Sequence, residues 1–220
     1  DSSVIASLSV NAIGKKRVIG LGLPCESSPE DLEDAKLIAQ HLGIKFIIID
    51  LTKPYNQFLE VFNSTIEPNT ISKANIKPRL RMIALYYVGQ SLGKYFVAGT
   101  GNRAELAIGY FTKYGDGGVD FEPLGMLYKS EVRELAKVLE IPKKIIEKLP
   151  SPGLWPGQTD EGEIGLMYNT IDEILYRTDY NLGFEGLNMD DVNKVKEMMR
   201  KAEHKLVMPP IYEIIEDNNR

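Results

Sequence analysis

The sequence predicts an α/β fold in which a parallel sheet is flanked by helices and followed by a helical C-terminal part. In the first half of the chain, short apolar runs alternate with segments of helical periodicity, which is typical of β-α-β units. In the second half, helical segments continue but no strong strand signal remains. The length of 220 residues, with 43% hydrophobic and 26% charged residues, suits one domain with a sizeable core. We therefore expect residues 1–220 to form a single domain.

Composition narrows the function classes. The net charge of −5 gives no electrostatic reason to expect nucleic acid as a main partner. No apolar run approaches the roughly 20 residues that a membrane helix needs, so we expect no membrane partner. Cys25 is the single cysteine, which excludes an internal disulfide and fits the reducing cytoplasm.

The first elements follow from local signals. Val4, Ile5, Leu8 and Ala12 predict a helix that begins right after Asp1-Ser2-Ser3. Because no strand precedes this helix, we expect the sequence to begin inside a larger unit, without its first strand and strand-to-helix loop.

Two strands and the helix between them come next. Residues 17–23 and 45–51 predict short apolar strands of the kind buried on both faces of a sheet. Between them, Ser28 caps a helix that has Pro29 at its first position and ends at Gly43.

The remaining elements are mostly helical. We predict helices over residues 53–66 and 76–92, a strand over 95–98 and another helix from Asn102. Further helices are predicted over residues 130–139, 142–149, 161–177 and 189–203. Residues 150–157 contain too many Pro and Gly to be regular and form a connector.

Candidate ligand-binding residues cluster at three places, because ligands of open parallel sheets bind outside the carboxyl ends of the strands. The first is Asp1-Ser2-Ser3, where free N–H groups and hydroxyls suit a phosphate and the carboxylate suits Mg²⁺. The second is the Gly-Thr-Gly turn at 99–101, which lets backbone approach an anion, with Glu105 one turn further on. The third is the irregular loop 109–120, which combines aromatic residues and glycines with Lys113 and Asp116.

Together with the helix segment Asn75-Ile76-Lys77-Pro78-Arg79-Leu80-Arg81-Met82, these elements form an ordered set. The set resembles the NAD synthetases, members of the PP-loop ATP pyrophosphatase group. Asp1-Ser2-Ser3 is similar to the last part of their SGGxDS loop, and the run Phe111 to Gly117 (FTKYGDG) is the most family-specific piece. Later matches are Leu127-Tyr128-Lys129, Gly157 to Glu161 with Glu163, and Glu203-His204-Lys205. The resemblance covers nearly the whole chain.

The resemblance implies a Rossmann-like fold of the adenine nucleotide alpha-hydrolase type and an ATP-dependent amidation. The carboxylate of deamido-NAD attacks the α-phosphate of ATP to give an NAD-adenylate and pyrophosphate, and ammonia then displaces AMP to give NAD. ATP and Mg²⁺ are the implied cofactors, because two mutually repelling anions must be brought together. Family members are typically homodimers.

The resemblance also assigns roles residue by residue. Asp1 and Glu105 match the magnesium ligands, and together with Lys129 they form the implied catalytic set. Matches to ATP contacts are Ser2, Ser3, Thr100, Lys129 and Ser151. Matches to contacts with deamido-NAD or phosphates are Arg79, Tyr110, Lys113, Asp116, Glu163, His204 and Lys205, with Tyr110 as a ring-stacking partner.

Three departures from the family pattern stand out. The glycines of SGGxDS are absent, so the sequence holds only part of the pyrophosphate cradle, and we expect weak ATP binding by these residues alone. Pro78 occupies a position where many relatives carry a small residue, which predicts a bend in the helix that presents Arg79. Gly22 stands where some bacterial members place an arginine that contacts ATP.

Several alternatives stay open at this point. Nitrogen can come from ammonia or from glutamine, and no glutaminase domain is present in these residues, so we predict ammonia dependence. The chain can instead be the synthetase domain of a glutamine-dependent enzyme, or another PP-loop adenylating enzyme such as a GMP synthetase domain. A tRNA-thiolating enzyme would usually show paired cysteines and a basic face, so the single cysteine and the negative net charge argue against it. A non-catalytic nucleotide-binding module of the universal-stress type would not need Glu105, Lys129 and the aromatic loop together.

Overall fold

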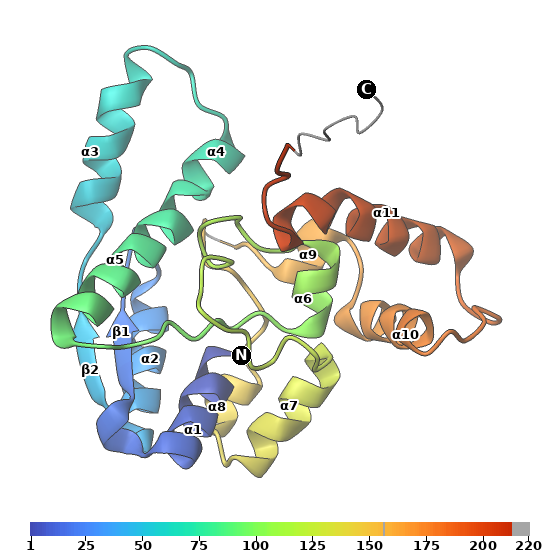
Figure 1. Cartoon of the computed structure of the whole chain (residues 1–220), viewed down its shortest axis with the longest axis horizontal. Coiled ribbons are helices and arrows are strands. Elements are labelled where there is room, and N and C mark those ends of the chain that lie inside the picture. Colours follow the sequence, from blue (N-terminus) through green and yellow to red (C-terminus); the bar gives the residue numbers. More distant parts are fainter. Residues whose placement is uncertain (156, 213–220) are drawn as a thin grey trace, which may run out of the picture.

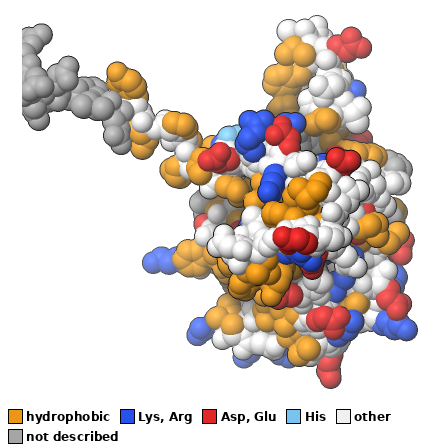
Figure 2. Space-filling view, turned by 90° about the vertical axis from the view of Figure 1, so that its right-hand side faces the viewer, with side chains coloured by type: hydrophobic (Ala, Val, Ile, Leu, Met, Phe, Trp, Pro, Cys, Tyr) orange, Lys and Arg blue, Asp and Glu red, His pale blue; other side chains and the backbone are white. Residues whose placement is uncertain are grey.

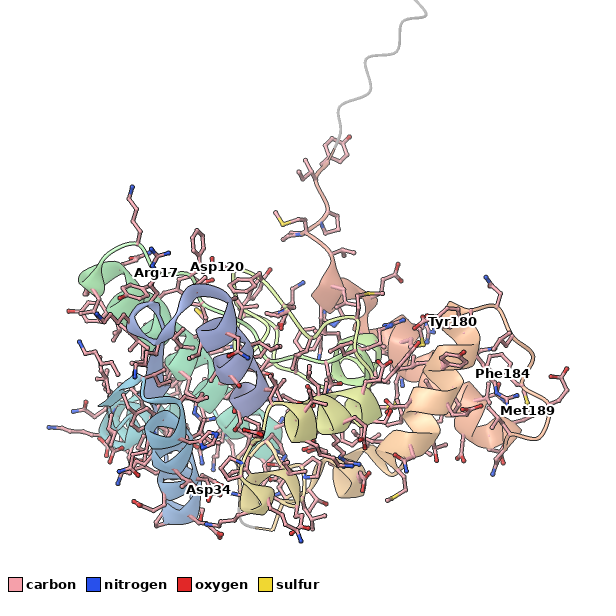
Figure 3. All side chains as sticks on the ribbon, turned by 90° about the horizontal axis from the view of Figure 1, so that it is seen from below. Arg17, Asp34, Asp120, Tyr180, Phe184 and Met189 are labelled. Atoms are coloured by element: carbon pink, nitrogen blue, oxygen red, sulfur yellow. The ribbon has the colours of Figure 1, made fainter. Side chains whose placement is uncertain are left out.

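A computed structural model describes residues 1–155 and 157–212 of the chain. Two parts lie at opposite ends of the molecule (Figure 1). We call residues 1–98 the sheet half, and we call the helices α6 and α9 to α11 together with their connecting loops the helical half. Figure 3 shows the same separation from below, with Arg17 and Asp34 at one end and Tyr180, Phe184 and Met189 at the other.

The sheet half starts with helix α1 (Ser2–Ile13), a short 3-10 turn η1 (Lys15–Arg17) and strand β1 (Ile19–Gly22). Helix α2 (Pro29–Leu42) leads to strand β2 (Lys45–Ile48), which pairs in parallel with β1 so that Ile19 lies opposite Lys45. The predicted signals hold for α2: the Ser28 hydroxyl accepts from the Glu30 N–H, and Gly43 is left-handed. This β-α-β unit confirms the predicted α/β fold with a parallel sheet.

Three helices cover the rest of the sheet half. They are α3 (Thr52–Asn63), α4 (Thr70–Ala74), which the sequence did not predict, and α5 (Ile76–Leu92). Helix α5 is continuous, and Pro78 lies in its first turn, where the missing N–H removes no intrahelical hydrogen bond. Pro78 therefore does not force the bend that we expected in this helix.

The predicted strand at residues 95–98 is reduced to a single parallel bridge between Ala98 and Phe121. The Asp120 N–H donates to the Val97 carbonyl at 2.9 Å, and the Gly99 N–H donates to the Phe121 carbonyl at 2.8 Å. The pairing partner thus lies just beyond the loop 109–120, a contact that local sequence signals did not reveal. It fixes the C-terminal end of this loop beside the 95–98 segment.

The remaining helices are α6 (Arg103–Ile108), α7 (Lys129–Val138), α8 (Lys143–Ile146), α9 (Asp160–Ile164), α10 (Tyr168–Asp179) and α11 (Met189–Leu206). The prediction of one helix over 161–177 is wrong, because the chain divides there into α9 and α10. Gly165 takes a left-handed conformation that ends α9, and a new helix then begins at Tyr168. No helix in the described part of the chain is long and apolar enough to cross a membrane.

The two halves are packed differently. The helical half surrounds a core of fully buried side chains that includes Tyr168, Ile171, Leu175 and Val195. In the sheet half, the expectation of strands buried on both faces is wrong, since every residue of β1 except Gly22 is only half-buried and Ile48 of β2 is 46% exposed. Figure 2 faces the helical half and shows charged and apolar side chains mixed over this side.

Candidate active site

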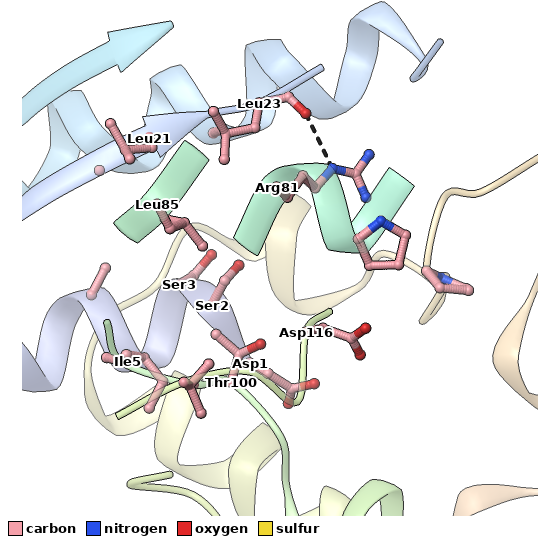
Figure 4. A pocket seen from close by; sticks show the side chains of 18 of the residues that line it. Asp1, Ser2, Ser3, Ile5, Leu21, Leu23, Arg81, Leu85, Thr100 and Asp116 are labelled. Carbon is pink, nitrogen blue, oxygen red and sulfur yellow. Dashed lines mark hydrogen bonds between the residues drawn. The ribbon is translucent and has the colours of Figure 1, made fainter. Parts of the chain in front are cut away.

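One cavity of about 1680 Å³ lies between the two halves and is lined by every residue that the sequence analysis selected. Typical small-molecule pockets are about 300–1,000 Å³, so this cavity exceeds what one ligand requires. Figure 4 shows Leu21, Leu23 and Leu85 on one side of it, opposite Asp1 and Thr100. The cavity thus has a polar part near Asp1 and an apolar part along β1.

Lys129 is the centre of the polar part. Its ammonium group lies 2.5 Å from Oδ2 of Asp1 and 3.0 Å from Oε1 of Glu105, and the side chain is only 9% exposed. The N-terminus of α7 positions it, because the N–H groups of Lys129 and Ser130 donate to the buried carboxylate of Asp172. The structure therefore brings together all three residues of the predicted catalytic set.

Glu105 is held in place by the start of α6. Its Oε2 accepts from the Asn102 N–H at 3.3 Å, while the Asn102 side chain accepts from the Glu105 N–H at 3.0 Å. This capping box fixes the side chain and leaves Oε1 facing Lys129. The carboxylate is thus oriented before any ligand arrives.

The carboxylates around Lys129 include an oxygen that could bind Mg²⁺. Oδ1 of Asp1 is buried and has no hydrogen-bond partner, and Glu105 stands on the other side of the same ammonium group. Among the described residues, no group of three or more His, Cys, Asp and Glu side chains is close enough to hold a metal ion. Two carboxylates, of which Asp1 has a free oxygen, fit Mg²⁺, which is commonly bound through one or two carboxylates plus substrate phosphates.

Tyr168 and Asp160 belong to this cluster, although the sequence analysis did not select them. The fully buried Tyr168 hydroxyl donates to Oδ2 of Asp160 at 2.8 Å, lies 3.3 Å from Oε1 of Glu105, and its ring faces the Lys129 ammonium at 4.9 Å. Burial raises the pKa of Asp160 above its ordinary value. The helix-capping signal at Thr159 was visible, but the buried position of Asp160 requires the tertiary fold.

The Gly-Thr-Gly turn already holds a carboxyl group in this structure, that of Glu122. Oε2 of Glu122 accepts from the Gly101 N–H at 3.0 Å, and a Cβ on Gly99 would lie 2.2 Å from the same carboxylate. Burial, helped by the negative charges of Glu105 and Asp116, raises the pKa of Glu122 to about 7. The Gly101 N–H is therefore already bonded, while the Thr100 side chain lines the cavity.

The loop 109–120 is folded tightly beside the cavity. Oδ1 of Asp116 accepts from the Thr112 N–H at 3.0 Å, and burial raises the pKa of the Asp116 carboxyl. Lys113 donates to the backbone carbonyl of His204, and Arg79 donates to the carbonyl of Lys113 at 3.3 Å. These contacts place three predicted residues, Arg79, Lys113 and Asp116, at one edge of the cavity.

The C-terminal end of α11 closes on this loop. The Lys205 ammonium donates to the carbonyls of Gly109 and Phe111 at 2.7 and 2.8 Å. His204 lies next to it in the cavity wall. In this structure Lys205 thus holds the backbone of the aromatic loop.

The remaining predicted residues, Ser151, Tyr110 and Glu163, are linked by hydrogen bonds between the connector, loop 109–120 and α9. The Ser151 hydroxyl donates to the Gln158 carbonyl at 2.7 Å, and the Gln158 amide donates to Oε2 of Glu163 at 2.7 Å. The Tyr110 hydroxyl donates to the same Glu163 oxygen at 2.8 Å, so the predicted stacking ring is tied to α9. Gln158 was not selected from the sequence, although it stands inside the Gly157 to Glu161 match.

Arg81 is a further, half-buried cation at this site. Its Nε donates to the Leu23 carbonyl at 3.1 Å, and its guanidinium also donates to the Ser27 hydroxyl at 3.1 Å (Figure 4). At Gly22, where some bacterial relatives carry arginine, a Cβ would lie 2.8 Å from the Phe46 ring and 2.9 Å from Leu32. An arginine therefore does not fit at position 22 unless Phe46 and Leu32 move.

Comparison with known proteins identifies the family. A model of the NAD synthase family matches residues 1–209. The NH₃-dependent NAD⁺ synthetase of Carboxydothermus hydrogenoformans is 50% identical over 213 residues, which cover 96% of this chain and 84% of that protein.

Two solved structures are also similar. The NMN synthetase of Francisella tularensis has a TM-score of 0.87 at 34% identity, with 97% of this chain and 85% of that chain covered. The NH₃-dependent NAD synthetase of Campylobacter jejuni has a TM-score of 0.81 at 31% identity, with 96% and 84% covered. These relatives confirm the predicted family and enzyme class, and the ammonia-dependent names among them support that prediction over the glutamine-dependent alternative. The chain belongs to the NAD synthase family.

Proposed function

We propose that the chain catalyses the ATP-dependent amidation of deamido-NAD to NAD, with ammonia as the nitrogen donor. The observation that carries this proposal is the contact of Lys129 with both Asp1 and Glu105 at the N-terminus of α1, inside the large cavity. A buried lysine between two carboxylates, beside the free N–H groups of a helix, suits binding of a polyphosphate. The family membership supports the same activity.

The reaction has two steps whose atoms balance. A carboxylate oxygen of deamido-NAD attacks the α-phosphorus of ATP, the bond to the β-phosphate breaks, and pyrophosphate leaves. The nitrogen of ammonia then attacks the acyl carbon of the NAD-adenylate and loses a proton, and AMP leaves. A free carboxylate is a poor acyl donor, whereas the mixed anhydride has a good leaving group.

The residues of the chain have distinct tasks in this proposal. Lys129 binds phosphate oxygens, and Ser2, Ser3, Thr100 and Ser151 contact ATP. Asp1 and Glu105 are the side chains that would hold Mg²⁺, which when bound supplies neutralisation of phosphate charge. Arg79, Tyr110, Lys113, Asp116, Glu163, His204 and Lys205 surround deamido-NAD or the phosphates.

The decisive experiment incubates the full-length protein with ATP, Mg²⁺ and deamido-NAD, and measures AMP and NAD. We expect both products with ammonium and neither with glutamine alone. A parallel arm replaces deamido-NAD by nicotinate mononucleotide, because one similar structure is that of an NMN synthetase. The proposal would be overturned if AMP formed with neither deamido-NAD nor nicotinate mononucleotide.

We also propose that residues 1–220 form one domain of a cytoplasmic enzyme that works as a homodimer, with no nucleic acid or membrane partner. Exposed apolar side chains on the outer helices of the sheet half support an interface there: Val61, Phe62, Ile71, Ile83 and Tyr87 are 45–73% exposed. Such a group of large apolar residues is typical of a protein contact surface. Light scattering on the purified protein tests this, and a monomer at micromolar concentration would contradict it.

A further inference from the structure

Lys77 is a buried lysine outside the Lys129 cluster, and the proposed function gives it no role. It lies in the first turn of α5, and its side chain is only 6% exposed. A buried ammonium group is costly unless its N–H bonds are satisfied and its charge is paired. The neighbours that satisfy it therefore indicate what the lysine holds together.

Three partners surround the Lys77 ammonium. Nζ donates to the Leu154 carbonyl at 3.0 Å, lies 3.2 Å from Oε2 of Glu26, and faces the ring of Tyr55 at 5.1 Å. Leu154 belongs to the connector, Glu26 to the loop after β1, and Tyr55 to α3. One side chain thus joins four segments that are far apart in the sequence.

Residues 150–155 and 157 of the connector form neither helix nor strand, so no regular secondary structure holds them in place. Its own hydrogen bonds are internal, as between Ser151 and Gln158 or between the Leu154 N–H and Gln158. Over residues 150–155 and 157–158, the bond from Lys77 is the only hydrogen bond that we find to the sheet half. The connector is otherwise tied to α9, at the other side of the cavity.

Glu26 joins the loop after β1 to the same Lys77 ammonium group. Its backbone is left-handed, with φ of 53°, and its N–H donates to the Thr52 hydroxyl at 3.1 Å. A glutamate seldom adopts this conformation without compensating contacts. The ion pair with Lys77 is such a contact, so the loop after β1 and the connector share one cation.

We propose that Lys77 is a positioning residue that fixes the connector segment 151–155 against α5 and thereby shapes the nucleotide side of the cavity. The part that concerns ATP rests on the proposed function, because Ser151 is assigned there as an ATP contact. Lys77 itself touches no predicted ligand position. Its effect on turnover comes through the placement of the Ser151 and Trp155 side chains, which line the cavity.

Trp155 provides a direct test, since it is the only tryptophan of the chain. Lys77→Met removes the ammonium but keeps a long apolar side chain, and Lys77→Arg restores a cationic donor. The matched control is Lys53→Met, which changes an exposed lysine of α3. Emission wavelength and acrylamide quenching of Trp155 are measured for each full-length variant, together with kcat and KM for ATP.

We expect Lys77→Met to shift Trp155 emission to longer wavelength, increase quenching, and raise KM for ATP about tenfold with a smaller change in kcat. Lys77→Arg should return part of each change, and Lys53→Met should resemble the wild type. If Lys77→Met does not fold, Glu26→Gln carries the test, with the same changes to a smaller extent.

The outcomes separate this inference from the proposed function. Unchanged Trp155 emission and KM in folded Lys77→Met, or in Glu26→Gln where that variant carries the test, would overturn the positioning role even if the wild type makes NAD. A wild type that forms no AMP would overturn the proposed function, while the Trp155 measurements would still decide whether Lys77 holds the connector.

Discussion

The helical half and the sheet half differ in where their apolar side chains go. In the helical half, Tyr168, Ile171 and Leu175 are completely buried against α11 and α6. In the sheet half, Ile19, Gly20 and Leu21 of β1 are only half-buried and line the cavity. The closely packed helical half therefore supports the residues that it carries, whereas the sheet half offers an apolar surface on which we expect ligands to lie.

Three carboxylates of the site belong to the helical half, whereas Asp1 belongs to the sheet half. Glu105, Asp160 and Glu163 stand on helices of the helical half, and each is fixed by at least one hydrogen bond. Rigid placement matters for such groups, because preoriented charges stabilise a transition state without reorganising during the reaction. We therefore expect substitutions in the two halves to have different effects on activity and stability.

The largest expected effect comes from Glu105→Gln. The glutamine side chain can still complete the capping box at Asn102, so α6 and the support should remain intact. Loss of the negative charge opposite Asp1 should lower kcat about a thousandfold, as for removal of a charge-stabilising group. Steady-state AMP formation measures the effect, with Glu134→Gln as a control because Glu134 is exposed on α7.

A wild-type rate in Glu105→Gln would contradict the assignment of Glu105. A large loss of thermal stability in the same variant would instead show that the helical half is not a support independent of this charge.

The second prediction compares two leucines directly. Leu175→Ala removes a side chain with 0% exposure from the core of the helical half and should reduce the free energy of unfolding by about 3 kcal/mol. Leu21→Ala removes a half-buried side chain that faces the cavity and should cost about 1 kcal/mol. Urea unfolding of both variants gives the two values, and equal losses would end the distinction between the halves.

Much of the difference between the sheet half and the helical half could be predicted from local signals in the sequence. Ser28, Pro29 and Gly43 define α2 because capping and backbone conformation act over a few residues. The ordered motifs predicted the family and selected residues that all line one cavity. The motifs could be recognised because their residue types suit ligand binding and their order along the chain is visible in the sequence.

Other features depend on contacts between distant segments. The bridge of Ala98 to Phe121 joins residues on both sides of a long loop, and the burial of Lys77 and Asp160 results from contacts between distant segments. The division between α9 and α10 had a local signal in Gly165, but the sustained apolar stripe favoured one helix instead. Periodicity alone does not show where a helix is interrupted.

The third prediction concerns pH at the boundary between the halves. Burial raises the pKa of Glu122 to about 7, above its ordinary value of 4.5. A group with a raised pKa in the folded state contributes stability at low pH, and this contribution is lost as pH rises through the folded pKa. Glu122→Gln keeps an acceptor for Gly101 but cannot ionise. Its stability relative to the wild type should therefore increase from about pH 5 to about pH 8, by about 1 kcal/mol after allowance for the half-exposed position.

Thermal unfolding of the wild type and Glu122→Gln across this pH range checks the prediction. A difference that stays constant would mean that Glu122 titrates normally and that the Gly-Thr-Gly turn does not depend on its charge. Glu134→Gln, a change at an exposed position of α7, serves as the control.

The smallest expected effect tests the rim of the helical half. Arg103 at the start of α6 and Asp179 at the end of α10 form a two-bond pair, at 2.9 and 2.6 Å, and both side chains are 20–25% exposed. Arg103→Lys keeps the charge but loses the fork geometry, and it should cost about 0.5 kcal/mol because partly exposed pairs contribute little. Denaturation by urea measures this value next to Leu175→Ala. If the rim pair proved as costly as the core leucine, the helical half would be held by its polar surface, and the contrast with the sheet half would have to be explained by charge instead of packing.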